Sequence, residues 1–460
     1  MTKFSLSALV AAGVLAGGLA TSASAADLGG NCCADLEERI AELEATTARK
    51  GNRKVSLTVS GFVAKQLLFF DDGRESNVRI TDTGSISIGT HVKFTGQATI
   101  APGVTAGYVL KIEAVTDDSL LVNQNSDNSV GSAFGTGGIA GGLGVESSYW
   151  FVKSDTLGRV SLGRQSSAVD NQAILPDGSG TLVVANYVQY DNNAFGLRNK
   201  NGALSSINYG SLATCATLNG AGGASADCDG VPNSNIRYDT PTFAGFSASA
   251  SWGEDDIWGV SGRYAGEFSG VKLSVAVAYV ESTDENFFNG GFNGQAAANG
   301  GFSAQAFQVG GYLEHVPTGL FVYGAYGTDT SDVSSAVRGA GLTNPEGDNW
   351  YIKPGIRTHL NSLGQTIFYG EYGKNNDKLT SALYDAGISS TDLKQYGLGV
   401  VQEVDSAAMS FWLAWRHYDA SVTCDVGFSC ARAGNALTTT AGKNNFDNLD
   451  IIKAGALINF

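Results

Sequence analysis

Apolar and polar residues alternate one by one through much of the chain after residue 55. The segment FSASASW, which begins at Phe246, alternates apolar residues with Ser247, Ser249 and Ser251. Successive side chains of a β-strand point to opposite faces, so this segment has one apolar face and one face of hydroxyl groups. The same alternation recurs in VTAGYVLKIEA from Val104, in VKLSVAVAYV from Val271 and in MSFWLAWRHY from Met409, where Trp412 interrupts it. The pattern predicts an all-β protein.

Short and long connections between these segments alternate along the chain. Short turn signals lie at residues 101–103, 154–158, 240–245, 265–270, 317–319, 360–364 and 405–408. Longer stretches rich in Gly, Asn, Asp and Ser lie near 71–84, 116–146, 166–233, 281–301, 327–349, 375–393 and 420–447, and GEDDI at 253–257 is a short exception. Seven tight turns and eight loops predict about sixteen antiparallel strands, each close to the length that crosses a bilayer when tilted.

Alternation by itself does not separate a transmembrane barrel from a soluble β-sandwich. An outer-membrane barrel has short turns at one end and long loops at the other, whereas a sandwich has no reason for this asymmetry. Aromatic residues near strand ends suit interfacial girdles: Phe69-Phe70, Tyr149-Trp150-Phe151, Trp252, Trp258, Phe268, Trp350-Tyr351 and Phe411-Trp412. We therefore predict a transmembrane antiparallel β-barrel over residues 55–460, with lipid on the apolar side and a polar lumen on the serine side.

The first 54 residues differ from the barrel sequence. Residues 1–25 read as a signal peptide, with Lys3, an apolar core and the cleavage motif Ala23-Ser24-Ala25. Residues 26–54 include CADLEERIAELEATT, whose apolar positions follow the spacing of a short coiled-coil seam. This periplasmic coil either self-associates within an oligomer or forms a solvated amphipathic cap.

Composition and charge narrow the classes of function. The 460 residues include 61 Gly, only 16% are charged, and the mean hydropathy of -0.03 is too polar for a helical membrane protein. The 44 Asp and Glu outnumber the 29 Lys and Arg, which argues against a nucleic-acid partner because phosphates need a basic surface. The acidic total suggests a preference for cations, but charges in the loops dominate that sum.

The cysteines agree with export to an oxidising compartment. Two pairs, Cys215 with Cys228 and Cys424 with Cys430, each bracket a loop-like stretch, so two local disulfides are predicted. Free thiols or metal ligands are the alternatives, and neither pair has neighbours at zinc spacing, so no metal is expected. Cys32 and Cys33 would be strained if bonded to each other, which leaves an interchain bridge open.

Sequence motifs for catalysis are missing. The chain has 4 histidines, none of them beside a nucleophile pattern, and it contains no HExxH, GxSxG or phosphate-binding loop. We therefore expect no catalytic residues, no cofactor and no enzymatic activity. A barrel enzyme that hydrolyses lipid or peptide bonds is the alternative from another class.

Three further features of the chain are the leader followed by the short coil, the segment RYDTPTFAGFSASASW, and the terminal Phe460. Together they resemble the general diffusion porins of the alphaproteobacterial type. The resemblance covers essentially the whole chain. It implies a homotrimer of sixteen-stranded barrels in the outer membrane of a Gram-negative bacterium, with passive diffusion of small hydrophilic solutes and ions through each pore. It also implies contact with outer-membrane lipid and lipopolysaccharide, and recognition of Phe460 by the barrel assembly machinery.

The resemblance further implies a constriction loop folded into each pore, here about residues 166–233. LPDGSG resembles the tip of that loop, so Asp177 is the first candidate for a carboxylate at the constriction, followed by Asp170 and Asp191. The family's second acidic position falls near Ala173, which puts a paired carboxylate in doubt. Basic residues of the family's barrel wall match Arg164 and lie near His91.

Strand parity alone adds three basic candidates for the lumen. These are Arg159, Lys111 and Arg237. Acidic groups on one side of a pore and basic groups on the other create a transverse field that orients solutes and sets ion selectivity.

Two further questions follow from the resemblance. A channel specific for a sugar or an anion is the main alternative function, although the loop is poor in the lysines that a phosphate channel would use. Similar N-termini suggest attachment of the mature start, Ala26-Asp27, to peptidoglycan.

Overall fold

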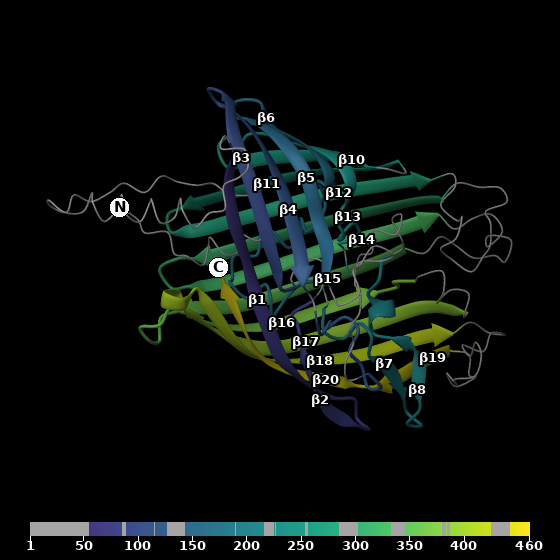
Figure 1. Ribbon diagram of the computed structural model, residues 1–460. Coiled ribbons are helices and arrows are strands. Elements are labelled where there is room, and N and C mark those ends of the chain that lie inside the picture. The colour runs from purple at the N-terminus through teal and green to yellow at the C-terminus, as the bar shows by residue number, and fades with distance from the viewer. Residues whose placement is uncertain are drawn as a thin grey trace.

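The computed structural model describes residues 55–84, 89–114, 116–126, 143–188, 190–215, 225, 227–253, 256–284, 302–332, 346–379, 383, 387–424 and 442–460. The predicted signal peptide, the coil, Cys32, Cys33 and Cys430 lie outside these residues. Within the described part, sixteen strands form one closed antiparallel cylinder, as the alternation predicts (Figure 1).

The cylinder is an up-and-down meander in which each strand pairs with the next. In order around the wall, its strands are β1 (Ser56–Asp71), β3 (His91–Ala101), β4 (Val104–Ala114), β5 (Leu143–Ser154), β6 (Gly158–Gln165), β9 (Asn233–Asp239), β10 (Phe246–Gly253), β11 (Ile257–Phe268), β12 (Val271–Asp284), β13 (Phe302–His315), β14 (Leu320–Asp332), β15 (Glu346–Thr358), β16 (Thr366–Asn376), β17 (Ile388–Val404), β18 (Met409–Cys424) and β20 (Leu449–Asn459).

The first and last strands close the sheet. β1 pairs with β20 over the register from Phe62 opposite Asn459 to Asp71 opposite Asp450. At the end of this seam, the backbones of Gly61 and Phe460 exchange two hydrogen bonds of 3.0 Å. Closure leaves the sixteen described strands of the cylinder without an unpaired edge, which is a requirement for a sheet that crosses a bilayer.

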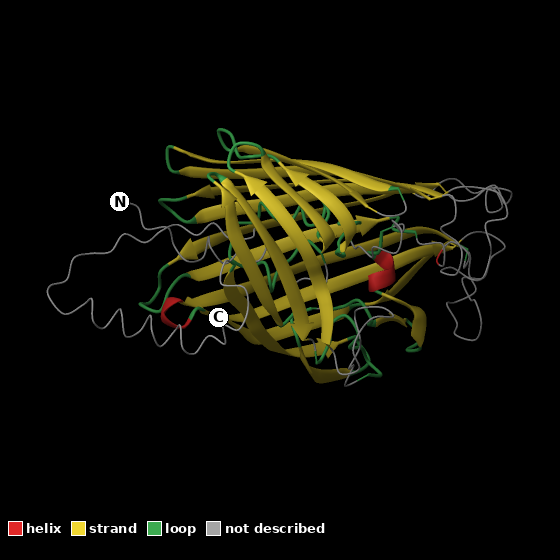
Figure 2. Cartoon of the chain, turned by 45° about the horizontal axis from the view of Figure 1, so that its top comes forward, coloured by secondary structure: helices red, strands yellow, loops and turns green. Residues whose placement is uncertain are grey.

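All seven predicted tight turns are confirmed, and they share one end of the cylinder with the C-terminus (Figure 2). Several of them need a positive φ, supplied by glycine at Gly103, Gly158, Gly270 and Gly319. One turn contains the short 3-10 helix η3 (Asp405–Ala407). Among the described residues, no helix has both the length and the apolar character needed to cross a membrane.

Additional short strands lie at the opposite end of the cylinder. β2 (Ser76–Thr81) pairs with the end of β1, β7 (Gly196–Asn199) pairs with β8 (Leu204–Asn208), and β19 (Gly442–Asp447) joins β18 to β7. The 3-10 helix η2 (Gly210–Leu212) follows β8. Figure 1 shows β7, β8 and β19 together at this end, away from the C-terminus. They extend the wall into the long connections.

The two faces of the wall follow the predicted alternation. In β10, the apolar residues from Phe246 to Trp252 are exposed on the outer face, whereas the intervening serines are half-buried on the inner face. The last strand likewise turns Ile452 and Ile458 outward. The serine face therefore meets the interior of the cylinder.

The prediction that neighbouring aromatic residues form outer girdles is wrong for one member of several pairs. Trp150 and Trp350 are exposed on the outer face, but Phe70, Phe151, Tyr351 and Trp412 are buried inside the cylinder. Adjacent residues of a strand point to opposite faces, so an aromatic pair cannot lie entirely in one girdle. The inner members pack in the interior, as described below.

Candidate functional site

The long connection after β6 folds into the cylinder and covers part of its inner surface. Its residues 168–188 are largely buried. Loop residues including Ala173, Ile174, Val184 and Tyr187 pack in one apolar cluster with inner side chains of β13–β18, β20 and β1. We call these inner faces the docked wall and residues 166–232 the constriction loop. Trp412, which interrupts the alternation of β18, belongs to this cluster.

A fully buried lysine fastens the loop tip to the docked wall. Lys353 of β15 donates from Nζ to Asp177 Oδ2 at 2.6 Å, to Thr181 Oγ1 at 2.7 Å and to the carbonyl oxygen of Ala185 at 2.7 Å. Both members of the Lys353–Asp177 ion pair are almost completely excluded from solvent. A buried charge is tolerated when it is paired and its remaining donors are satisfied, and this lysine meets both conditions.

A second buried lysine repeats the arrangement farther along the loop. Lys453 of β20 pairs with Asp191 at 2.5 Å and donates to the carbonyl oxygen of Val184 at 2.8 Å. Gln66 of β1 donates to the other oxygen of Asp191 at 3.2 Å. Asp177 and Asp191 thus serve as the loop's two anchoring carboxylates.

Neutral hydrogen bonds fasten the loop between its entrance and its tip. Tyr323 Oη donates to the carbonyl oxygen of Ala173 at 2.6 Å, and the Ala173 amide donates to Gln308 Oε1 at 2.8 Å. Gly310 lies beneath this point, and a Cβ there would be 1.9 Å from the Ala173 oxygen. The loop backbone lies so close to β13 that a side chain at Gly310 has no room.

Three buried carboxyl groups gather near the loop entrance. Burial raises the pKa of Asp227 to about 7 and that of Asp229 to about 8, and burial together with the charge of Asp227 raises the pKa of Asp170 well above its ordinary value. Asp227 Oδ1 accepts hydrogen bonds from the Asn171 amide and from Gln308. We call Asp170, Asp227 and Asp229 the acidic cluster.

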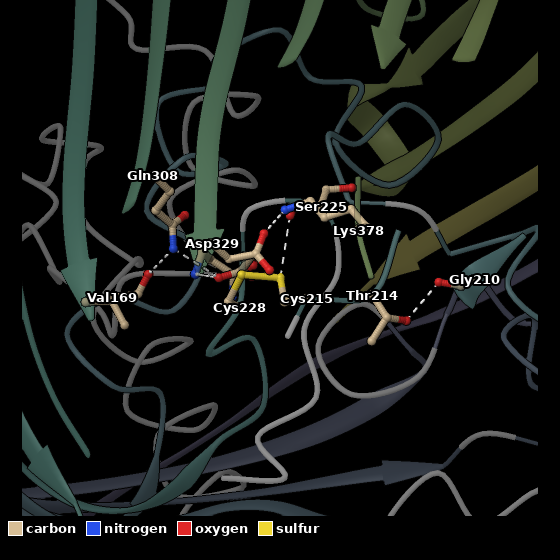
Figure 3. The surroundings of a disulfide bond; sticks show 11 residues. Val169, Gly210, Thr214, Cys215, Ser225, Cys228, Gln308, Asp329 and Lys378 are labelled. Carbon is tan, nitrogen blue, oxygen red and sulfur yellow. Dashed lines mark hydrogen bonds and ion pairs between the residues drawn. A yellow bond between two sulfur atoms is a disulfide. The ribbon is translucent and has the colours of Figure 1, made fainter. Parts of the chain in front are cut away.

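A disulfide joins two parts of the connection beside this cluster. Cys215 and Cys228 are bonded, with their Cα atoms 5.5 Å apart, which confirms the disulfide predicted for this pair. Figure 3 shows the bridge beside Asp329, which pairs with Lys378, and near Gln308, which donates to the Val169 carbonyl at 2.9 Å. The two sulfurs and an Asp329 oxygen lie within 4.8 Å of one another, but disulfide sulfurs are not thiolate ligands.

The other predicted disulfide extends beyond the described residues. Cys424 ends β18 and is disulfide-bonded. Because Cys430 is outside the described part of the chain, the pairing of these two residues stays a prediction.

Another part of the inner surface is left open and is strongly basic. It consists of the cavity-lining residues of β3–β6 and β9–β11, which we call the open wall. Together with turn residues and the C-terminus, it lines a cavity of about 910 Å³. Six cavity-lining side chains are Lys or Arg: Lys93, Lys111, Lys153, Arg159, Arg237 and Arg263. Three are carboxylates: Glu146, Asp155 and Asp239.

Two of these carboxylates are bound to neighbouring cations. Lys111 forms an ion pair with Glu146, and Arg237 pairs with Asp239 at 2.8 Å. Ser249 of the serine face donates to the same oxygen of Asp239 at 2.6 Å. Because Asp239 is already engaged by two donors, it offers little free negative charge to the cavity.

The constriction loop meets the open wall along one border. Arg237 donates to the carbonyl oxygens of Ser166 and Ser167 at 3.2 and 2.8 Å. Arg263 donates from Nε to Gln172 Oε1 at 2.6 Å. The Ala168 amide donates to Ser251 Oγ at 2.9 Å, so the serine face of β10 also holds the loop entrance.

The structure divides the basic candidates from the sequence into two groups. Lys111, Arg159, Arg237 and His91 all line the cavity. Arg164 lies elsewhere: it shares the outward parity of the exposed residues of β6, and its Nε donates to the Glu146 carbonyl oxygen at 3.2 Å.

The acidic candidates all lie in the loop and are buried. Asp177 and Asp191 pair with the two anchoring lysines, and Asp170 belongs to the acidic cluster. Ala173, near which the resemblance implies a second acidic position, accepts the hydrogen bond from Tyr323. None of these four residues is among those that line the cavity.

Sequence reasoning missed both anchoring lysines and three lining cations. Lys353 and Lys453 follow the outward-facing Ile352 and Ile452, so their inward parity was visible in the sequence. Lys93, Lys153 and Arg263 could have been found in the same way. What parity does not reveal is which inward charges the loop covers.

Comparison with known proteins adds evidence on family and fold. A family model described as Gram-negative porin matches residues 6–410. A search of curated proteins found no match. Among solved structures, the chain is similar to an anion-selective porin from Comamonas acidovorans, at 14% identity over 88% of this chain and 100% of that one, with a TM-score of 0.54. It is also similar to a loop L8 deletion mutant of OmpT, an outer membrane protein of Vibrio cholerae, at 11% identity over 88% and 100% of the two chains, with a TM-score of 0.50. At these low identities, the two similarities support the fold of this chain and nothing further.

Proposed function

Because this chain belongs to the Gram-negative porin family, it is an outer-membrane channel for passive diffusion of solutes, and we propose that small hydrophilic solutes and ions cross it beside the constriction loop, along the open wall. The observation that supports this route is the cavity of about 910 Å³. It is lined by strand residues from within the cylinder and by residues of the turn end, including Thr240, Ala408 and Phe460.

The candidate residues take different roles in this proposal. Lys111, Arg159, Arg237 and His91 line the route, so a passing solute meets them directly. Asp177 and Asp191 act through the position of the loop, because their carboxylates are occupied by the anchoring lysines. The electric field across the pore then comes mainly from the basic residues that line the route, because the anchoring lysines neutralise the carboxylates of Asp177 and Asp191.

Reconstitution into planar lipid bilayers tests the proposed route. Purified protein is expected to insert in discrete conductance steps and to carry ions without a ligand. Replacement of Ser247 by Trp, which points a bulky ring from the open wall into the cavity, should reduce single-channel conductance. The matched change Ala250→Trp, on the outer face of the same strand, should not. Equal conductance of the two variants would exclude this route.

We propose that the channel is a homotrimer without hydrolytic activity. The family membership supports both statements. Three equal closure steps under high voltage would support the trimer, whereas single closures would contradict it. Hydrolysis of lipid or peptide substrates by the purified protein would contradict the second statement.

The remaining partners stay predictions. They are outer-membrane lipid and lipopolysaccharide, the barrel assembly machinery through Phe460, and peptidoglycan through the mature N-terminus. Mass analysis of muropeptides after digestion would show whether the chain is linked to peptidoglycan.

A further inference from the structure

We propose that the open wall makes this channel selective for small hydrophilic anions, although the whole chain has a formal charge of -15. The inference rests on the proposed function, since it assigns a class of solute to the same route. It reverses the preference that the acidic composition suggests. The argument depends on where the charges lie and which of them are already paired.

The cavity has more positive than negative side chains. Six Lys and Arg side chains face three side-chain carboxylates and the C-terminal carboxylate of Phe460 around it. Glu146 and Asp239 are engaged by Lys111 and Arg237. The remaining four cations, Lys93, Lys153, Arg159 and Arg263, form no ion pair with a described residue.

The loop does not supply the missing negative charge. A carboxylate that faced the open wall from the constriction loop would balance it, and the loop's carboxylates outside the acidic cluster are Asp177 and Asp191. Both are turned to the docked wall and paired with buried lysines. The acidic cluster is buried as well, and the raised pKa values of its members reduce its negative charge near neutral pH.

Cross-strand register brings positive charges directly together. Lys93 lies opposite Lys111, and Lys153 lies opposite Arg159. Directly opposed like charges destabilise a sheet. Mobile anions in a water-filled lumen relieve this repulsion. The opposed cations are therefore consistent with a wall at which anions from solution accumulate.

Arg159 also contributes positive charge to the cavity, as its contacts show. Its guanidinium lies 4.3 Å from the centre of the Phe151 ring and 5.4 Å from that of Tyr149. Its buried Nε has no hydrogen-bond partner among the described residues. The arginine is thus held in place by aromatic rings while its charge is left for the cavity.

Local charge outweighs total charge because of screening. The Debye length is about 8 Å at physiological ionic strength, so exposed acidic residues in distant loops contribute little inside the pore. Charges of one sign along a narrow channel with low-dielectric walls act on every ion that passes and concentrate ions of the opposite sign. The sign of the open wall therefore decides selectivity.

The test is the reversal potential of the purified full-length channel in a planar bilayer under a KCl gradient. The expected sign is that of chloride selectivity, with a chloride-to-potassium permeability ratio above one. Conductance with potassium selectivity would overturn this inference while leaving the proposed function intact. Absence of conductance would instead contradict the proposed function, so the two failures can be told apart.

Matched variants locate the selectivity on the open wall. The double change Lys93→Gln and Arg159→Gln should lower the permeability ratio several-fold without abolishing conductance. Lys93→Arg with Arg159→Lys keeps the charges and should retain the ratio. Lys200→Gln removes a charge outside the cavity, where Lys200 pairs with Asp447, and should also leave the ratio unchanged. A ratio that survives the double change, or falls equally with Lys200→Gln, would overturn the inference.

Discussion

The docked wall and the open wall belong to one continuous sheet, yet inward-facing cations have opposite surroundings on the two walls. On the docked wall, Lys353 and Lys453 are buried and satisfied by acceptors of the constriction loop. On the open wall, Lys93, Lys153, Arg159 and Arg263 line the cavity of about 910 Å³ and form no ion pair with a described residue. Both sets share the inward parity of a polar lumen. The comparison shows that coverage by the loop decides whether an inward charge stabilises the fold or acts on solutes.

Breaking the Lys353–Asp177 pair should have the largest effect on this division. Lys353→Met leaves a buried carboxylate without its partner, which typically costs about 3–5 kcal/mol. We expect the loop tip to leave the docked wall, with larger and noisier single-channel currents and a lower unfolding temperature.

A double variant provides the control for this change. Lys353→Met with Asp177→Leu removes both charges, and replacement of a buried pair by apolar residues is often nearly neutral. It should therefore be less disturbed than Lys353→Met alone. If the double variant were the more unstable of the two, the ion pair would not be the anchor.

A steric clash that pushes the constriction loop away from β13 should have the next largest effect. In Gly310→Ala, the new Cβ would lie 1.9 Å from the carbonyl oxygen of Ala173, so the loop or strand must shift. Overpacking of this kind typically costs about 1–3 kcal/mol. Gly311→Ala is the matched control, because the nearest atoms to its Cβ would be 4.0 Å away. Currents and thermal stability should change for the first variant only.

The acidic cluster should make loop docking weaker at high pH. Because the folded loop raises the pKa of Asp227 to about 7 and of Asp229 to about 8, it favours their protonated forms. The unfolded carboxyl groups titrate near pH 4, so this stabilisation is full below that value and is lost as pH rises to about 8. Current noise should therefore increase as pH rises from about 4 to about 8.

Neutral variants isolate the cluster from other titrating groups. Asp227→Asn with Asp229→Asn should reduce the dependence of noise on pH across the same window, because two of the three buried carboxyl groups no longer titrate. Arg237 and Asp170, whose charges act on each other, are retained in this variant. An unchanged pH profile would show that the cluster does not control docking.

The smallest effect is expected at the border between the walls. Ser251→Ala removes the acceptor for the Ala168 amide, a neutral hydrogen bond worth about 0.5–1.5 kcal/mol. Ser247→Ala, on the same face of β10, lines the cavity and is the control. Hydrogen exchange at the loop entrance should rise for Ser251→Ala alone. Equal exchange in both variants would show that Ser251 does not hold the loop.

The residue pattern along the chain is enough to predict the cylinder: its strands, its seven turns and the side that each strand shows to the interior. Alternation of period two is a local signal, because each side chain records the solvent that its face meets. That signal also placed Lys111, Arg159 and Arg237 in the lumen. It failed at Trp412 and Tyr351, where the inner face meets a packed loop instead of water.

The division of the interior, in contrast, depends on contacts between segments that are far apart in the chain. The carboxylate of Asp177 could have faced the pore, but it pairs with Lys353, 176 residues away in the chain. No local pattern specifies which distant strand a loop will cover, since burial of both surfaces and pairing of their charges occur together when the chain folds. The open wall is basic because the loop carboxylates that could have balanced it were buried against the docked wall.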